Sequence, residues 1–335
     1  MRPTVILLLI VLAASMILIP TFLVLVLNDD QTKAKSNEKN VDLEVDPTKS
    51  VQVKVYRSNL DKIETYNLEE YVRGVVAAEM PINFEIEALK AQAIAARTYI
   101  VKKIIDKNYS DVPSGAMVTD TVKHQVFLSE EELKRQWGLN YEENISKLNN
   151  AVNQTNGQVI TYNGKPIDAL YFSTSNGYTE NSEDYWEKEV PYLRSVASPW
   201  DLDSPKYNDT TFVPFSEIES VLKIDTAVIS TSGQEWIKIL GTTTGKRVKE
   251  IKIGDRILTG REVRTLFKLD SSSFTWELKA DGIQFYTKGY GHGVGMSQYG
   301  ANGMAKEGTK AIDIIKHYYT DVSITSIENW IKINN

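Results

Sequence analysis

An uncharged apolar run near the N-terminus constrains this chain more than any other feature. Residues 5–27 contain no charged side chain, and only one serine, one proline and one threonine break the run. About 20 apolar residues are enough to cross the hydrocarbon core of a bilayer, so the run predicts a transmembrane helix. Arg2 precedes the run and Asp29 and Asp30 follow it, which favours an N-terminus in the cytoplasm.

The apolar run divides the chain into three parts. Residues 1–28 are predicted to be a cytoplasmic N-terminus with a single-pass anchor in the cell membrane. A cleavable signal peptide is the alternative, but the run is longer than the usual apolar region of such peptides, and no small-x-small cleavage site follows Leu27. Residues 29–50 are polar and charged, as in a tether. We therefore expect residues 51–325 to fold and work outside the cytoplasmic membrane.

Composition excludes several classes of function. The formal net charge is −6, whereas nucleic-acid-binding domains usually carry a basic patch, so no nucleic-acid partner is expected. The chain has no cysteine, which excludes disulfides, thiolate nucleophiles and zinc sites that need sulfur. The three histidines are His124, His292 and His317, and no two of them have the spacing of a local metal site. We expect neither a metal nor a cofactor.

Periodicity predicts an α+β fold with segregated helices and antiparallel strands. Val51, Val53 and Val55 alternate with polar residues, which indicates a strand, and Asn163-Gly164 lies between two alternating runs, as in a hairpin. Residues of about 198–282 could form a smaller second lobe. Within it, residues 236–240 and 248–253 resemble strands, and the stretch TGREVRTLFKL resembles a short helix.

Two helices are predicted near the start of the extracytoplasmic part. The first begins after Asn67, with Glu70 placed to complete a capping-box-like pair, and it should end near Glu79 because Pro81 disfavours helical geometry at the preceding residue. The second helix, from about residue 84 to 103, is rich in alanine. Small side chains on several of its faces would allow close packing against more than one neighbour.

Glu79 is the strongest candidate for a catalytic residue. It lies eleven residues after Leu68 and four after Val75, so it projects from the apolar stripe of the first helix at its last turn. Burial and the negative end of the helix dipole should both raise its pKa, as a general acid requires. The alternative is a structural ion pair with a nearby cation such as Arg97 or Lys90.

Two loop-like segments could contact a ligand. Residues 171–178 combine hydroxyl, amide and aromatic side chains after a strand, which suits a sugar chain, although such clusters are more often simple turns. Residues 288–301 contain five glycines at 289, 291, 293, 295 and 300, which would allow close approach of the backbone to a ligand. Their GxGxGxG spacing is not the dinucleotide-binding fingerprint. His292, in this segment, could contact the ligand or be structural.

Taken together, these segments resemble the stage II sporulation protein D family of peptidoglycan lytic transglycosylases. The resemblance rests on EYVRGVVAAEMP and ALKAQAIAARTY, on YFSTSNGYTE, on LTGREVRTLFKLDSSSF and on GYGHGVGMSQYGA. It implies that Glu79 is the catalytic acid and that a group of residues forms or supports the glycan cleft: Arg97, Tyr171, Ser173, Thr174, Ser175, Asn176, His292, Gln298 and Tyr299. Some relatives hold zinc with cysteine ligands, and without cysteine that metal is not carried over to this chain.

The resemblance further implies how one carboxyl group could cleave the linkage between N-acetylmuramic acid and N-acetylglucosamine. The muramic acid's own 6-hydroxyl attacks its anomeric carbon and leaves a 1,6-anhydro end, in septal wall remodelling and engulfment during sporulation. The implied partners are peptide-stripped glycan strands, a sporulation cell-wall amidase (stage II protein P) and a membrane localiser (stage II protein M). One alternative is a non-catalytic glycan-binding activator of an amidase. Another is a hydrolytic muramidase, whose second carboxylate would come from Glu180, Glu183 or Asp184.

Overall fold

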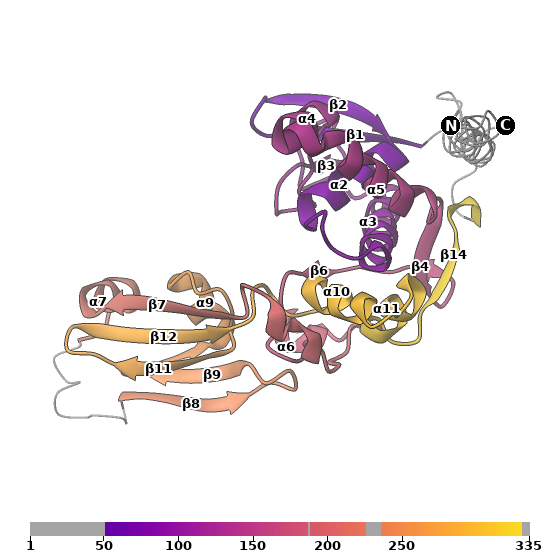
Figure 1. Ribbon diagram of the computed structural model, residues 1–335. Helices are drawn as coiled ribbons and strands as arrows, with labels where there is room; N and C mark the ends of the chain where they lie inside the picture. The colour runs from indigo at the N-terminus through magenta and orange to yellow at the C-terminus, as the bar shows by residue number, and fades with distance from the viewer. Residues whose placement is uncertain (1–50, 187, 226–235, 330–335) are drawn as a thin grey trace, which may run out of the picture. The chain divides into compact units, whose positions relative to one another are not determined.

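The computed structural model describes residues 51–186, 188–225 and 236–329, all within a compact unit that spans residues 49–335. The predicted anchor and tether lie outside the described residues. Within those described ranges, no helix has the length and apolar character needed to cross a bilayer. The described part combines helices with mainly antiparallel sheets, so the α+β prediction is confirmed (Figure 1).

The first half of the described chain is mainly helical. Its elements are β1 (Gln52–Arg57), β2 (Lys62–Asn67), α2 (Leu68–Glu79), α3 (Ile86–Asp106), β3 (Val118–Thr119), α4 (Glu130–Trp137), η1 (Gly138–Asn140), α5 (Tyr141–Asn153), β4 (Gln158–Tyr162), β5 (Lys165–Pro166), β6 (Tyr171–Phe172) and α6 (Ser182–Trp186).

The second half is richer in strands. Its elements are η2 (Pro199–Asp203), β7 (Asn208–Pro214), α7 (Phe215–Leu222), β8 (Ile237–Thr242), β9 (Val248–Ile253), β10 (Arg256–Thr259), α9 (Gly260–Leu266), β11 (Phe274–Leu278), β12 (Gly282–Lys288), β13 (Met296–Ser297), α10 (Gln298–Lys306), α11 (Ala311–Tyr318), β14 (Ser323–Ser326) and η4 (Ile327–Asn329).

Helix α3 is the centre of the larger hydrophobic core. It packs against α2, α5, β4, α10 and α11, with α2 and α5 on one side and α10 and α11 on the other (Figure 1). Its alanines are fully buried, whichever side of the helix they face: Ala88, Ala91, Ala93, Ala95 and Ala96. Small side chains on several faces therefore let one helix contact several neighbours, as the sequence predicted.

Most local predictions for this core are confirmed. Helix α2 ends at Glu79 and the backbone turns extended at Met80, before the proline. Asn163 and Gly164 join β4 to β5 with φ of 48° and 71°, the left-handed turn that the hairpin requires. The predicted capping box is wrong, because the Asn67 side chain accepts a hydrogen bond from Gln52 Nε2 (2.6 Å) and does not cap the helix.

A second hydrophobic core lies between residues 213 and 285. Two three-stranded antiparallel sheets, ordered β10-β9-β8 and β11-β12-β7, surround it with helices α7 and α9 (Figure 1). The predicted strands at 236–240 and 248–253 form β8 and β9, and the predicted helix forms α9. Helix α9 begins with a capping box in which Thr259 and Glu262 bond each other's backbone.

The two loop-like segments of the sequence lie side by side. Strand β13 pairs in parallel with β6, which sets Met296 opposite Tyr171. Two isolated bridges extend the contact, one between Thr174 and Tyr290 and one between Glu180 and Val294. Segments separated by more than a hundred residues thus form one structure, and it carries Tyr171 and Gln298 to the end of α2.

Candidate active site

Glu79 is the last residue of α2, and its carboxyl group is partly buried against three other segments. The amide of Val126 donates a hydrogen bond to Oε1 (2.9 Å). Burial raises the pKa of Glu79 above its ordinary value, while the Val126 amide and the side chains of Gln298 and Tyr171 act in the opposite direction. The net rise extends the pH range over which Glu79 keeps a proton that it can donate.

No cation neutralises Glu79 among the residues that the structure describes. Arg97 instead donates two hydrogen bonds to Glu69, and Lys90 pairs with Glu87 at 2.8 Å. The structural ion pair that the sequence left open, with Arg97 or Lys90, is therefore absent.

Tyr171 and Gln298 complete the surroundings of Glu79. The Tyr171 hydroxyl accepts a hydrogen bond from Gln125 Nε2 (3.1 Å), and Gln125 Oε1 accepts one from the Tyr71 hydroxyl (3.0 Å). Gln298 is the first residue of α10 and is almost fully buried, yet its Nε2 has no hydrogen-bond partner of good geometry in the described chain. The Gln298 amide therefore lies beside the Glu79 carboxyl group and opposes the rise of its pKa, although its geometry is not that of a good hydrogen bond.

Arg97, predicted to form or support the glycan cleft, is paired with Glu69 and not with Glu79. Its side chain is fully buried and also donates to the carbonyl oxygen of Gln158 (3.2 Å). Its partner Glu69 lies in the first turn of α2, about 15 Å along the helix axis from Glu79. Arg97 therefore ties α3 to the opposite end of α2 and to β4.

The polar loop 173–176 is mostly structural. Thr174 and Ser175 are fully buried, and their hydroxyl groups bond Ser204 and Asp201, so neither reaches a ligand. Asn176 donates to the carbonyl oxygen of Gly245 (3.0 Å) and to Ser273 Oγ (3.1 Å), which ties the loop to the second core. Thr174 and Ser175 are thus engaged within the protein, whereas Asn176 is partly exposed and its predicted glycan contact stays a prediction. Among residues 173–176, only Ser173 is both partly exposed and without a side-chain hydrogen bond to another segment of the described chain; its hydroxyl group contacts that of Thr174.

Asp201 organises this loop, and no sequence pattern pointed to it. The carboxyl group is fully buried and accepts hydrogen bonds from the hydroxyl groups of Ser175, Ser198 and Ser297, and from the Ser175 amide. Burial raises its pKa, and these donors oppose the rise. Because Ser297 caps α10, Asp201 joins the polar loop to the helix that carries Gln298.

His292 is partly exposed and lies in a cluster of aromatic side chains. Its ring packs among three aromatic rings, Phe172, Tyr185 and Trp186, at 5.3–5.8 Å between centroids. Burial, with the nearby charges of Arg264 and Arg247, lowers the pKa of His292 to about 3. The imidazole is therefore neutral near physiological pH.

The glycines of the second segment approach protein atoms, not an open ligand site. Gly293 and Gly295 have φ of 86° and 81°, which side-chain-bearing residues rarely adopt. A Cβ at Gly295 would lie 2.1 Å from the carbonyl oxygen of Leu170, and one at Gly293 would lie 2.5 Å from the Arg247 guanidinium carbon. At these two positions the close approach that the glycines allow joins this segment to β6 and to the second core.

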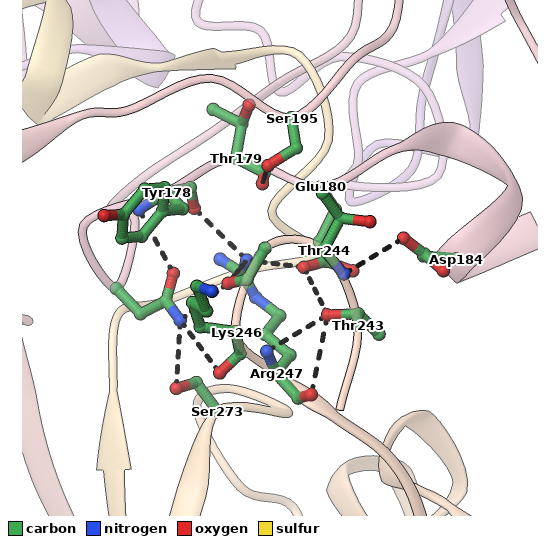
Figure 2. A network of polar contacts seen from close by, with 12 residues as sticks. Tyr178, Thr179, Glu180, Asp184, Ser195, Thr243, Thr244, Lys246, Arg247 and Ser273 are labelled. Carbon is green, nitrogen blue, oxygen red and sulfur yellow. Dashed lines mark hydrogen bonds and ion pairs between the residues drawn. The ribbon is translucent and has the colours of Figure 1, made fainter. Parts of the chain in front are cut away.

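The candidates for a second catalytic carboxylate have other partners. Glu180 forms a buried ion pair with Arg247 (3.2 Å) and accepts a hydrogen bond from Thr243 (2.7 Å), in the network that Figure 2 shows. Glu183 pairs with Arg194, and Asp184 accepts a long hydrogen bond from the Thr244 amide (3.4 Å). None of the three forms a hydrogen bond or an ion pair with Glu79 in the described part of the chain.

The described residues contain no group of three histidine, aspartate or glutamate side chains that could hold a metal ion. His124 is engaged elsewhere: its Nδ1 meets the Thr119 hydroxyl (2.8 Å) and its Nε2 meets Asp111 (2.9 Å). Burial lowers the pKa of His124.

Comparison with known proteins gives consistent results. The family "SpoIID: Stage II sporulation protein" matches residues 56–162, which include Glu79. Stage II sporulation protein D of Bacillus subtilis (strain 168) is 43% identical over 95% of this chain and 94% of its own length. The protein of the same name from Bacillus amyloliquefaciens is 47% identical over 84% of this chain and 80% of its own. A protein named "Amidase enhancer" from Bacillus subtilis (strain 168) is 33% identical over 76% of this chain but only 40% of its own length.

Proposed function

Because this chain belongs to the stage II sporulation protein D family, we propose that it is a lytic transglycosylase that cleaves peptidoglycan glycan strands during sporulation. The observation that carries the proposal is the state of Glu79. It is a partly buried carboxyl group with a raised pKa, and no cation pairs with it among the described residues. This is the state that a general acid requires.

The proposed reaction uses Glu79 twice. Its proton first passes to the oxygen that bridges the two sugars, as the bond from that oxygen to the anomeric carbon of muramic acid breaks. The 6-hydroxyl of the same muramic acid then bonds to the anomeric carbon, and the Glu79 carboxylate takes the hydroxyl proton. The acid is thereby regenerated, and the product carries a 1,6-anhydro end.

A single carboxyl group suffices for this reaction because the nucleophile belongs to the substrate. Glycosidases that use water generally need two carboxylates. An intramolecular hydroxyl has a high effective concentration and does not need a second protein group to hold it. The ion pairs of Glu180 and Glu183 support this reading over a hydrolytic one.

Mass spectrometry of the products tests the proposal. Peptide-free glycan strands are incubated with the full chain, with its Glu79→Gln variant, and with the control Glu142→Gln on the exposed face of α5. We expect 1,6-anhydro ends with the wild type and the control, and a loss of at least about a thousandfold in rate with Glu79→Gln. Reducing ends in place of anhydro ends would make the protein a hydrolase, and an active Glu79→Gln variant would remove Glu79 from the mechanism.

A second candidate function is suggested by the relative named "Amidase enhancer". On this reading the chain binds glycan without cleaving it and activates a cell-wall amidase. The same incubation distinguishes the two functions, because an activator would bind strands and leave their length unchanged. Faster release of stem peptides by an added amidase would then identify the activator.

We propose that the chain is held in the cell membrane by residues 5–27, with the glycan-cleaving part outside. In this arrangement an amidase that strips stem peptides would act first and supply the peptide-free strands. Membrane fractionation of cells, combined with protease treatment of intact protoplasts, tests the topology. The full chain should sediment with membranes and lose its C-terminal part to external protease, whereas full protection from protease would contradict this orientation.

A further inference from the structure

The loop of residues 120–129, which we call the Val126 loop, reaches the Glu79 carboxyl group from outside helix α2. The Val126 amide donates a hydrogen bond to Glu79 Oε1 (2.9 Å). Gln125, the preceding residue, donates to the hydroxyl group of Tyr171 (3.1 Å). The loop contains neither a helix nor a strand, so its position depends on contacts with other segments.

Helix α2 has a glycine where the Val126 loop passes over it. The Leu128 amide donates a hydrogen bond to the carbonyl oxygen of Gly74 (3.3 Å). A Cβ at Gly74 would lie 2.3 Å from Phe127 Cε2 and 2.5 Å from the Leu128 carbonyl oxygen, so any larger residue would push the loop away from the helix. The loop thus contacts α2 at two levels, Gly74 and Glu79, which are about 7.5 Å apart along the helix axis.

Arg57, the last residue of β1, contacts the beginning and the middle of the Val126 loop and the helix that follows the loop. Its Nε donates to Asp120 Oδ2 (3.0 Å), and its guanidinium carbon lies 5.1 Å from the centre of the Phe127 ring. Its Nη2 donates to Glu132 in the first turn of α4. A planar guanidinium presents five donors in fixed directions and can hold these partners at once, which an ammonium group cannot do in the same geometry.

Three carboxylates surround this single guanidinium group, which is only 3% exposed. They belong to Glu64 (2.9 Å), Asp120 and Glu132. Glu64 also pairs with Lys62 (2.8 Å), but Asp120 and Glu132 have no second cation among the residues that the structure describes. Like charges repel when no cation lies between them. The positions of Asp120 and Glu132, on either side of the loop, therefore depend on Arg57.

We propose that Arg57 is a positioning residue of the active site, which holds the Val126 loop so that the Val126 amide stays within hydrogen-bond distance of Glu79. The inference rests on the proposed function for the reaction that Glu79 carries out. Arg57 forms no hydrogen bond or ion pair with Glu79 in the described chain, and its effect passes through the loop. The amide fixes the direction of the carboxyl group and stabilises its charge after the proton has left.

The groups around Glu79 allow this effect to be measured in its pKa. The titratable side chains that interact with it are Tyr71 of α2 and Tyr171 of β6, and burial raises the pKa of both well above the ordinary value of 10.0. Gln298 of α10 carries no charge, and no cation pairs with Glu79 in the part of the chain that the structure describes. Displacement of the Val126 amide should therefore change the pKa of Glu79 without any other group titrating nearby.

Arg57→Lys tests the inference, because it keeps one positive charge and loses the geometry that bonds Asp120 and Glu132 together. The pKa of Glu79 is measured on the full chain by NMR of glutamate labelled at the carboxyl carbon, with Glu79→Gln to assign the signal. Rates on peptide-free strands are measured from pH 4 to 9. We expect the pKa of Glu79 to rise, because the carboxylate loses a donor. The decline of kcat/KM should move to higher pH, and its maximum should fall by about tenfold or more.

Asp120→Asn provides a second variant if Arg57→Lys does not fold. Asparagine has nearly the same shape as aspartate but carries no charge for the Arg57 guanidinium group. Removal of a negative charge would by itself lower the pKa of Glu79, so a rise in this variant identifies displacement of the amide as the cause. Ile251→Val, in the second hydrophobic core, is the control for a loss of stability alone and should leave the pKa of Glu79 and the pH profile unchanged.

The outcomes separate this inference from the proposed function. A folded Arg57→Lys or Asp120→Asn variant that loses rate equally at every pH, with the pKa of Glu79 unchanged, would overturn the positioning role and leave the transglycosylase standing. If the wild type cleaves no strand but Arg57→Lys still raises the pKa of Glu79, the positioning role stands and the proposed reaction is wrong.

Discussion

Glu79 shows how one residue can be costly to the fold and useful to the reaction. The carboxyl group is partly buried and receives one backbone hydrogen bond, but no cation in the described chain offsets its charge. Its pKa is therefore higher in the folded chain than in the unfolded chain, and the folded state binds the proton more tightly. The stability from this proton is present at low pH and is lost as pH rises through the raised pKa.

Glu79→Gln should therefore stabilise the protein near neutral pH. The glutamine keeps an oxygen for the Val126 amide and carries no charge to bury. We expect its melting temperature to exceed that of the wild type by about 2–4 °C for each kcal/mol of unfolding free energy that is gained by removing the buried charge. The difference should vanish below the ordinary glutamate pKa of about 4.3, where the wild type is protonated in both states. Calorimetry from pH 4 to 8 measures this, with the exposed Glu142→Gln as control, and a destabilised variant at neutral pH would contradict the burial argument.

The pH dependence of cleavage follows from the same carboxyl group. The first step needs protonated Glu79, so kcat/KM should fall as pH rises through the raised pKa of Glu79. His292 should contribute nothing to this profile, because its imidazole is already neutral above a pKa of about 3. Rates measured on peptide-free strands from pH 4 to 9 give the profile. A single decline with a midpoint above that of ordinary glutamate is expected, and a rate that increases up to pH 8 would contradict the role of Glu79 as acid.

At the scale of elements, the segment from Gly289 to β13 depends on glycine because the chain crosses the end of β6 so closely. Gly295→Ala would combine a positive φ with a Cβ 2.1 Å from the Leu170 carbonyl oxygen. Gly164→Ala is a matched control, since φ is also positive there (71°) but nothing lies within 4 Å of the added Cβ. We expect the control to cost about 1–2 kcal/mol of unfolding free energy and Gly295→Ala to cost several kcal/mol more. Equal losses in chemical denaturation would mean that the contact with Leu170 has no energetic role.

Sequence patterns predicted those elements whose causes are local. Pro81 ends α2 at Glu79, and Asn163-Gly164 forms the hairpin turn, because the backbone preferences of these residues act within a few positions. The capping box at Asn67 failed because a neighbouring strand, through Gln52, competes for the asparagine side chain.

The parts of the candidate site that could not be predicted depend on contacts between distant segments. Nothing in the sequence near Arg97 or Ser175 shows that each has a carboxylate partner, Glu69 or Asp201, at least 26 positions away. The Val126 amide that bonds Glu79 is a backbone group, so it leaves no mark in the side-chain pattern.

At the scale of the whole described unit, the two hydrophobic cores are joined through a buried ion pair. Arg247, just before β9 of the second core, donates to Glu180 and to the carbonyl oxygen of Tyr178 (3.2 Å each), as Figure 2 shows. The Glu180 amide in turn bonds the carbonyl oxygen of Gly293 (2.8 Å), in the segment that leads to Gln298. Burial raises the pKa of Glu180 and lowers that of Arg247, so removing water from both charges is costly even when they are paired. The ion pair between Glu180 and Arg247 therefore specifies how the two hydrophobic cores are connected, more than it adds to stability.

If the ion pair has this role, substitutions at Glu180 and Arg247 should have strongly non-additive effects on the free energy of unfolding. Arg247→Met leaves the Glu180 carboxylate buried without a cation, which should cost about 3–5 kcal/mol, whereas Glu180→Gln combined with Arg247→Met should cost clearly less than Arg247→Met alone. The loss of unfolding free energy in Arg247→Met should become smaller as pH falls, because Glu180 can then take up a proton. The double variant should lack this pH dependence. Urea denaturation at pH 5 and pH 8 measures both effects, with the exposed Arg256→Met as control. Losses of unfolding free energy that are additive and do not change with pH would contradict this role of the ion pair. Packing alone would then hold the second core to the segment beside Glu79.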